Sequence, residues 1–82
     1  MQTDPFSASR AILERCDWSR LTPRDSLLLE HISRGLTDER IGEQLQLSTD
    51  SVKHHVRRVV AAIGARNRTH AVALALRAGR IL

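Results

Sequence analysis

Apolar residues recur along this chain at the spacing of amphipathic helices, and helix-capping residues separate the apolar segments. The clearest start is Thr22-Pro23, where an N-cap hydroxyl precedes a helix-starting proline, and Asp25 completes a capping box. Apolar side chains then follow at helical spacing, at Leu27, Leu28 and Ile32. Gly35 supplies a left-handed stop, so the pattern predicts a helix between Thr22 and Gly35.

Three further helices are predicted by the same signals. Thr37 caps a short helix with Asp38 and Glu39 in its first turn, where acidic residues favour the helix dipole. Ser48 caps a longer helix that reaches about Ala62 and stops at Gly64, and the last helix, about residues 68–78, follows Asn67 and ends at Gly79. Strand-like alternation is missing, which favours an all-α fold.

The residues ahead of these helices predict one more. Asp4-Pro5 or Ser7 can start a helix over about residues 5–16, with an apolar stripe of Phe6, Ile12, Leu13 and Cys16. This stripe either packs on the main domain, which is the usual role of such residues, or contacts a partner. The expected organisation is an N-terminal helical extension over 1–19 and a main helical domain over 20–82.

The middle of the chain predicts a helix-turn-helix. The second helix of such a pair needs a small residue where its partner crosses, and Gly42 stands there. The motif also needs apolar residues one position before this small residue, three positions after it, inside the turn and early in the next helix. Those four places hold Ile41, Leu45, Leu47 and Val52.

The long helix has two different faces. At 100° per residue the core stripe contains Val52, Val56, Val59 and Ile63. A second stripe, roughly 140° away, contains Asp50 and the candidate base-contacting residues Lys53, His54 and Arg57. Lys and Arg donate to guanine O6 and N7 in the major groove, and His can donate or accept there. Asp50 can accept from cytosine or simply favour the helix dipole, which is the simpler interpretation.

Charge supports a polyanion partner. Residues 1–48 carry six Arg against eight Asp or Glu, net −2, whereas residues 49–82 carry seven Lys or Arg against Asp50 alone, net +6. Candidate phosphate contacts flank the basic stripe and the start of the last helix: Thr37, Ser51, His55, Arg58, Arg66, Arg68 and Thr69. The alternative for residues 66–69 is plain capping by Asn67 beside solvated arginines.

These motifs, in order, resemble the LuxR-type (GerE or NarL/FixJ) helix-turn-helix domain. The resemblance covers roughly residues 20–82 and rests on Leu21-Thr22-Pro23-Arg24, Gly35-Leu36-Thr37, Ile41, Leu45, Leu47-Ser48, Val52-Lys53, His55, Gly64, Arg66-Asn67-Arg68-Thr69 and Ala71-Val72. The chain departs from the family pattern at Asp25 and Arg40, where Glu is usual, at Ser51, where Thr is commoner, and at Gly42, where Ala is usual. By helix propensity alone, Gly42 should cost about 1 kcal/mol relative to Ala.

The resemblance implies a four-helix domain that binds DNA as a dimer, with residues 52–57 in the major groove. Lys53, His54 and Arg57 match the base-facing positions, and the last helix matches the dimerisation helix. On that helix Ala71, Leu74, Ala75 and Ala78 form a core face, and Val72 and Leu76 are the candidate dimer contacts, unless they are only a thin edge of the core. We expect a stand-alone member of the family, from a bacterium or its phage, with control supplied from outside the chain.

The predicted function is therefore sequence-specific DNA binding in transcription regulation, with duplex DNA and a second copy as partners, and RNA polymerase or another regulator as a further candidate. The competing hypothesis is an interaction protein that sequesters a related regulator without binding promoters itself. We expect no enzyme, metal or cofactor, because Cys16 and His31 lie in different helices and no metal-ligand spacing occurs. A single cysteine and the absence of a long apolar run predict a cytoplasmic, nucleoid-associated protein without a membrane span.

Overall fold

The computed structural model describes residues 16–82, and over this range it is all-helical, as predicted. A short 3-10 turn, η1 (Trp18–Arg20), precedes four α-helices: α2 (Pro23–Ser33), α3 (Asp38–Leu45), α4 (Thr49–Ala62) and α5 (Arg68–Arg77). No strand occurs among these residues. The helix predicted over about residues 5–16 lies outside the described residues, so its existence and role stay a prediction.

Every α-helix starts at the cap that the sequence predicts. The side chains of Thr22, Thr37, Ser48 and Asn67 each accept the backbone N–H three residues on. The Thr22 cap is a complete capping box, because the Asp25 carboxylate also accepts the Thr22 N–H at 2.9 Å. These caps satisfy N–H groups that the first helical turn leaves without a partner.

The ends of the helices are also determined by residues close to them in the sequence. After three of the helices the chain passes through a left-handed glycine, at Gly35, Gly64 and Gly79. Helix α3 ends differently, at Gln46, whose φ of 57° is left-handed without the relief that glycine gives. Both the Gln46 and the Leu47 N–H donate to the Gly42 carbonyl, so hydrogen bonds close the tight turn that connects α3 to α4.

Gly42 allows this turn to form. A Cβ on Gly42 would collide with the backbone carbonyl oxygen of Leu47, which cannot move aside as a flexible side chain can. Glycine at this position therefore avoids a clash with the turn, alongside the helix-propensity cost that it carries. A residue of α2 also stabilises the turn, because the Arg24 guanidinium donates to the Leu45 carbonyl at 3.0 Å.

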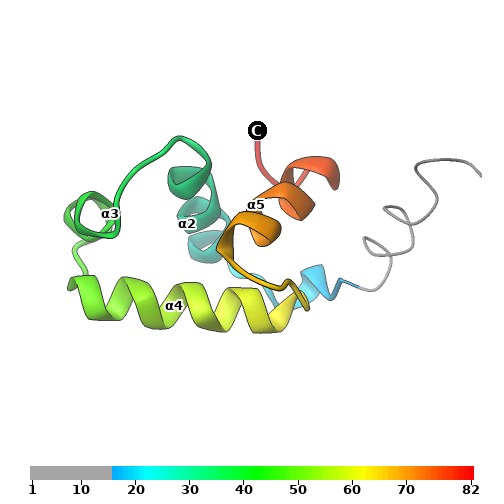
Figure 1. Ribbon diagram of the computed structural model, residues 1–82, viewed down its shortest axis with the longest axis horizontal. Coiled ribbons are helices and arrows are strands. Elements are labelled where there is room, and N and C mark those ends of the chain that lie inside the picture. Colours follow the sequence, from blue (N-terminus) through cyan, green and yellow to red (C-terminus); the bar gives the residue numbers. More distant parts are fainter. Residues whose placement is uncertain (1–15) are drawn as a thin grey trace, which may run out of the picture.

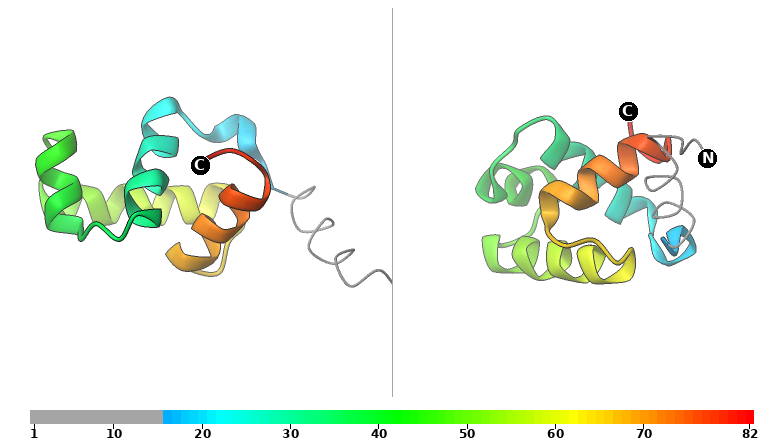
Figure 2. Two further views of the ribbon diagram at one scale, coloured as in Figure 1. Left: turned by 90° about the horizontal axis from the view of Figure 1, so that it is seen from above. Right: turned by 45° about the vertical axis from the view of Figure 1, so that its right-hand side comes forward.

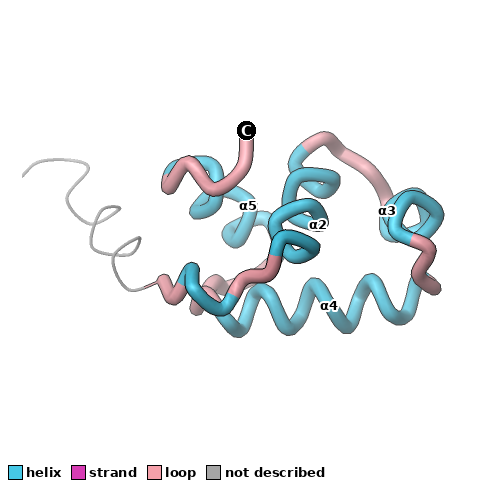
Figure 3. Tube along the Cα trace, turned by 180° about the vertical axis from the view of Figure 1, so that it is seen from behind, coloured by secondary structure: helices cyan, strands magenta, loops and turns pink. Residues whose placement is uncertain are grey.

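The core lies between α4 and the other three helices. Figure 1 shows α4 along one edge of the domain, with α2, α3 and α5 all on the same side of it, and the view from behind in Figure 3 agrees. Helix α3 packs mainly on α4, and α5 packs on both α2 and α4. The predicted stripe of α4 faces inward, since Val52, Val56, Val59 and Ile63 are all buried.

Helix α2 is rotated relative to the apolar stripe that the sequence suggests. Leu28 and Leu29 are almost fully buried, whereas Leu27 is 41% exposed. Of the apolar residues noted at helical spacing, Leu27 therefore lies outside the buried face. The reason is that the buried face follows Asp25, Leu28, Leu29 and Ile32, which are spaced by three and four residues, and Leu27 falls outside that series.

The two ends of the described chain meet on the same core. Cys16 and Ile81 are buried in it, and Trp18 packs against it. The Arg80 guanidinium lies 5.6 Å from the centre of the Trp18 ring, within the range of a cation–π contact. Figure 2 shows η1 and the C-terminal segment from two further sides. Residues at both ends of this range therefore contribute to the packed domain.

Candidate nucleic-acid interface

The face of α4 turned away from the core carries the candidate base-contacting residues. Lys53, His54 and Arg57 are all exposed, and Asp50 at the start of the helix is exposed too. No other described helix lies on this side of α4 in Figures 1 and 3. The structure thus brings together the three residues that the helical spacing groups, on a surface that another macromolecule can reach.

Two hydrogen bonds cap the start of α4. The Ser48 hydroxyl caps the helix by accepting the Ser51 N–H at 3.1 Å and donates to the Ser51 hydroxyl at 3.0 Å. Ser51 and His55 are half-buried beside the exposed stripe, and the His55 ring meets the His54 ring edge-on. The hydroxyl of Thr37 is likewise used as a helix cap, on the exposed start of α3.

The start of α5 combines capping with exposed positive charge. The Asn67 side chain accepts the His70 N–H at 2.8 Å, and His70 Nδ1 in return accepts the Arg66 N–H at 3.0 Å. This reciprocal pair fixes the backbone that carries Arg66, whose side chain is exposed together with Thr69. Capping by Asn67 and a candidate phosphate site therefore coexist at this helix start.

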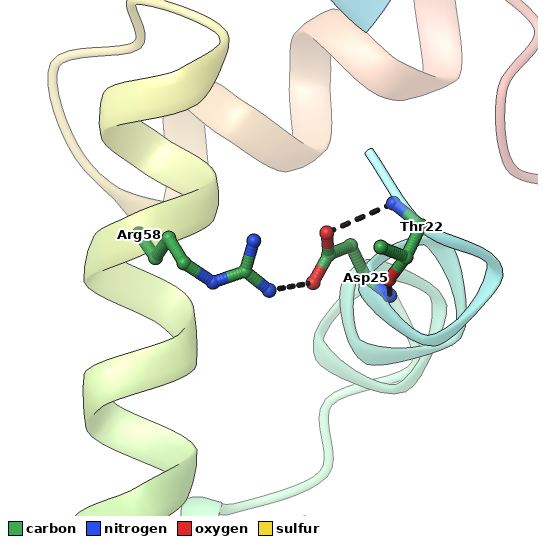
Figure 4. Close-up of polar contacts among 3 residues, drawn as sticks. All are labelled: Thr22, Asp25 and Arg58. Atoms are coloured by element: carbon green, nitrogen blue, oxygen red, sulfur yellow. Dashed lines mark hydrogen bonds and ion pairs between the residues drawn. The ribbon is translucent and has the colours of Figure 1, made fainter. Parts of the chain in front are cut away.

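Arg58 has a partner that the sequence analysis did not predict. Its guanidinium forms an ion pair with the Asp25 carboxylate, which is 1% exposed and also holds the Thr22 N–H (Figure 4). The Arg58 side chain is 44% exposed, so part of it still faces solvent. The pair ties the middle of α4 to the start of α2.

The candidate dimer residues are in different environments. Val72 is half-buried and packs against the core, whereas Leu76, one turn further along α5, is 45% exposed. The core face of α5 holds Ala71, Leu74 and Ala75, which are buried, and Ala78 is only partly buried. Leu76 is therefore the more accessible of the two candidates.

Metal binding and thiol chemistry find little support among residues 16–82. No group of three or more His, Cys, Asp or Glu side chains within this range could hold a metal ion. Cys16 is buried, and this burial raises the pKa of its thiol, which disfavours a reactive thiolate. Within the same range, no helix combines the length and the apolar character that crossing a bilayer requires.

A helix-turn-helix whose second helix exposes a basic face defines a DNA-binding domain of the kind found in transcription regulators. The model of the GerE family, bacterial regulatory proteins of the luxR family, matches residues 19–75, and the chain therefore belongs to the luxR family.

Two curated relatives agree with this assignment. The chain is 38% identical over 74 residues to the transcriptional activator protein BjaR1 of Bradyrhizobium diazoefficiens, a match that covers 88% of this chain and 31% of that protein. It is 40% identical over 58 residues to the uncharacterized transcriptional regulatory protein YxjL of Bacillus subtilis, covering 71% of this chain and 27% of that protein. The chain thus spans less than a third of the length of these two relatives.

Proposed function

We propose that this domain regulates transcription by binding duplex DNA sequence-specifically, with α4 in the major groove. The observation that carries the proposal is the exposed face of α4, where Lys53, His54 and Arg57 lie together without a covering helix. The names of both relatives, a transcriptional activator and a transcriptional regulatory protein, support the same function.

The chemistry of this face suits base recognition. An α-helix fits the width of the major groove, where Lys and Arg donate to guanine O6 and N7 and His can donate or accept. Thr37, Arg66 and Thr69 are exposed at the starts of α3 and α5, Ser51 and His55 are half-buried on α4, and the exposed part of Arg58 adds a cation. Contacts from these residues to phosphates would set the register of the domain on DNA and make its affinity salt-dependent.

We further propose that the domain binds DNA as a homodimer through α5. The exposed Leu76 supports this, because a large apolar side chain on a helix surface gains by packing against a second copy. A two-fold symmetric dimer would prefer inverted half-sites with a spacing set by its axis.

The test is a binding series on a DNA site selected from random sequence and on its single-base variants. Arg57→Ala should weaken binding to the selected site by about 1–3 kcal/mol and abolish discrimination at one base position. Arg34→Ala is the matched control, since it removes one exposed arginine at the end of α2, next to the loop that Figure 1 places far from α4. It should leave base discrimination unchanged.

If the wild-type domain binds all sequences equally and weakly, the proposal is wrong. The interaction protein that sequesters a related regulator would then be the better explanation, since it needs no sequence discrimination.

A further inference from the structure

Asp38, the first residue of α3, contacts the start of another helix. Its carboxylate forms an ion pair with Arg68, the first residue of α5, with 2.8 Å between Asp38 Oδ1 and the Arg68 guanidinium. The Asp38 side chain is 16% exposed and that of Arg68 is 36% exposed. The pair therefore joins the starts of two helices, each of which carries candidate phosphate contacts.

Positive charges on both α5 and α4 lower the pKa of this carboxyl. Its contact with Arg68 holds the pKa of the Asp38 carboxyl below its usual range, against the opposing effect of burial, and the positive charge of Lys53 lowers the pKa further. Asp38 Oδ1 is buried without a well-aligned hydrogen bond from the residues described, so a close ion pair is the better description of the contact. Asp38 thus has a cation of α5 on one side and a cation of the base-facing stripe nearby.

Helix capping alone does not explain this arrangement. An acidic residue in the first turn of a helix is favourable because of the helix dipole, but that effect needs neither burial nor a specific cation. Glu39 occupies the same turn of α3 and is exposed. The burial of Asp38 and its contact across to α5 are therefore features of the interface between the helices.

We propose that Asp38 is a positioning residue for DNA binding, which holds the Arg68 guanidinium at the start of α5 in place to contact a phosphate. This inference rests on the proposed function. Its physical basis is that a long arginine side chain loses rotamer freedom when it binds a phosphate, and a side chain already held in place loses less. Arg68 has further guanidinium N–H groups that can reach a phosphate while one faces Asp38.

The proposal predicts an effect opposite in sign to simple charge arithmetic. Removing an acidic charge from a DNA-binding surface should by itself tighten binding to a polyanion. If Asp38 positions Arg68, Asp38→Asn should instead weaken binding to the selected site about five- to ten-fold. Glu39→Gln, the matched control, removes the same charge one residue away and should bind equally well or more tightly.

A double-variant cycle separates positioning from a general loss of structure. In an Arg68→Gln background, Asp38→Asn should cause no further loss of affinity, because the residue through which it acts is gone. An equal loss in both backgrounds, or a variant Asp38→Asn that is folded and binds as tightly as wild type, would overturn the proposal. In those cases the wild type still binds its site, and the proposed function stands.

A measurement on the wild-type protein keeps the test independent of whether Asp38→Asn folds. NMR relaxation of the arginine Nε–H groups in the free domain should show an ordered Arg68 and a mobile Arg66, although both belong to the same candidate phosphate site. Equal mobility of the two side chains would contradict the proposal. A wild type that discriminates no DNA sequence would overturn both the proposed function and this inference.

Discussion

Arg58→Met is expected to destabilise the domain, because it leaves the buried carboxylate of Asp25 without its cation. Methionine keeps the unbranched stem and a high helix propensity, so the substitution removes the guanidinium with little other change. The Thr22 N–H remains as a donor to Asp25, 2.9 Å away, but it carries no net charge to balance the carboxylate. The perturbation is thus confined to one charge pair between α2 and α4.

The size of the effect follows from the burial of the two partners. Removing one partner of a buried ion pair costs about 3–5 kcal/mol. Asp25 is 1% exposed, but the Arg58 side chain is 44% exposed, so water already screens part of the interaction. We therefore expect a loss of about 2–3 kcal/mol, below that range. For a domain of this size, this corresponds to a fall in Tm of roughly 8–24 °C.

The assay is thermal and urea unfolding followed by circular dichroism, with Arg57→Met as the matched control. Arg57 is the preceding residue on α4 and is exposed, so its substitution should change stability by no more than about 0.5 kcal/mol. The double variant Asp25→Asn/Arg58→Met should be less destabilised than the sum of the two single variants. If Arg58→Met and Arg57→Met have the same stability, the account of the ion pair is wrong.

Three further predictions concern other parts of the domain. Gly42→Ala should lower the Tm despite the higher helix propensity of alanine, because its Cβ would collide with the Leu47 carbonyl; a higher Tm would contradict the packing described for the turn. Asp38→Asn should be less stable than wild type at neutral pH. Because the folded pKa of the Asp38 carboxyl lies below its usual 3.8, this difference in stability should shrink as the pH falls from about 5 and vanish below the folded pKa. Urea unfolding at a series of pH values would show this. Leu76→Glu should leave the monomer folded and shift sedimentation equilibrium towards monomer, since it places a charge on the proposed dimer surface; an unchanged association constant would rule that surface out.

The helix boundaries could be predicted from the sequence because their causes are local. A capping side chain such as Thr22 or Asn67 acts on an N–H three residues away, and a glycine such as Gly35 adopts its left-handed conformation at one position. The buried stripe of α4 could be predicted for a similar reason, since helical spacing alone places Val52 and Val56 on one face.

The contacts between helices could not be predicted in the same way. Arg58 and Asp25 are separated by 33 positions, and nothing in the sequence near either residue indicates that they pair. The same holds for Arg68 and Asp38, which only the packing of α5 near α3 brings together. The rotation of α2 also depends on its neighbours, which is why Leu29 is buried and Leu27 is not.

The most direct test of sequence-specific DNA binding is selection from a random duplex library, performed with the wild type and with a Lys53→Ala/His54→Ala/Arg57→Ala variant. All three side chains are exposed, so the variant should fold with nearly wild-type stability. We expect the wild type to enrich one motif, arranged as inverted half-sites, and the variant to enrich none. Enrichment of the same motif by both proteins, or of no motif by the wild type, would contradict the assignment of the exposed face of α4 as the surface that recognises DNA.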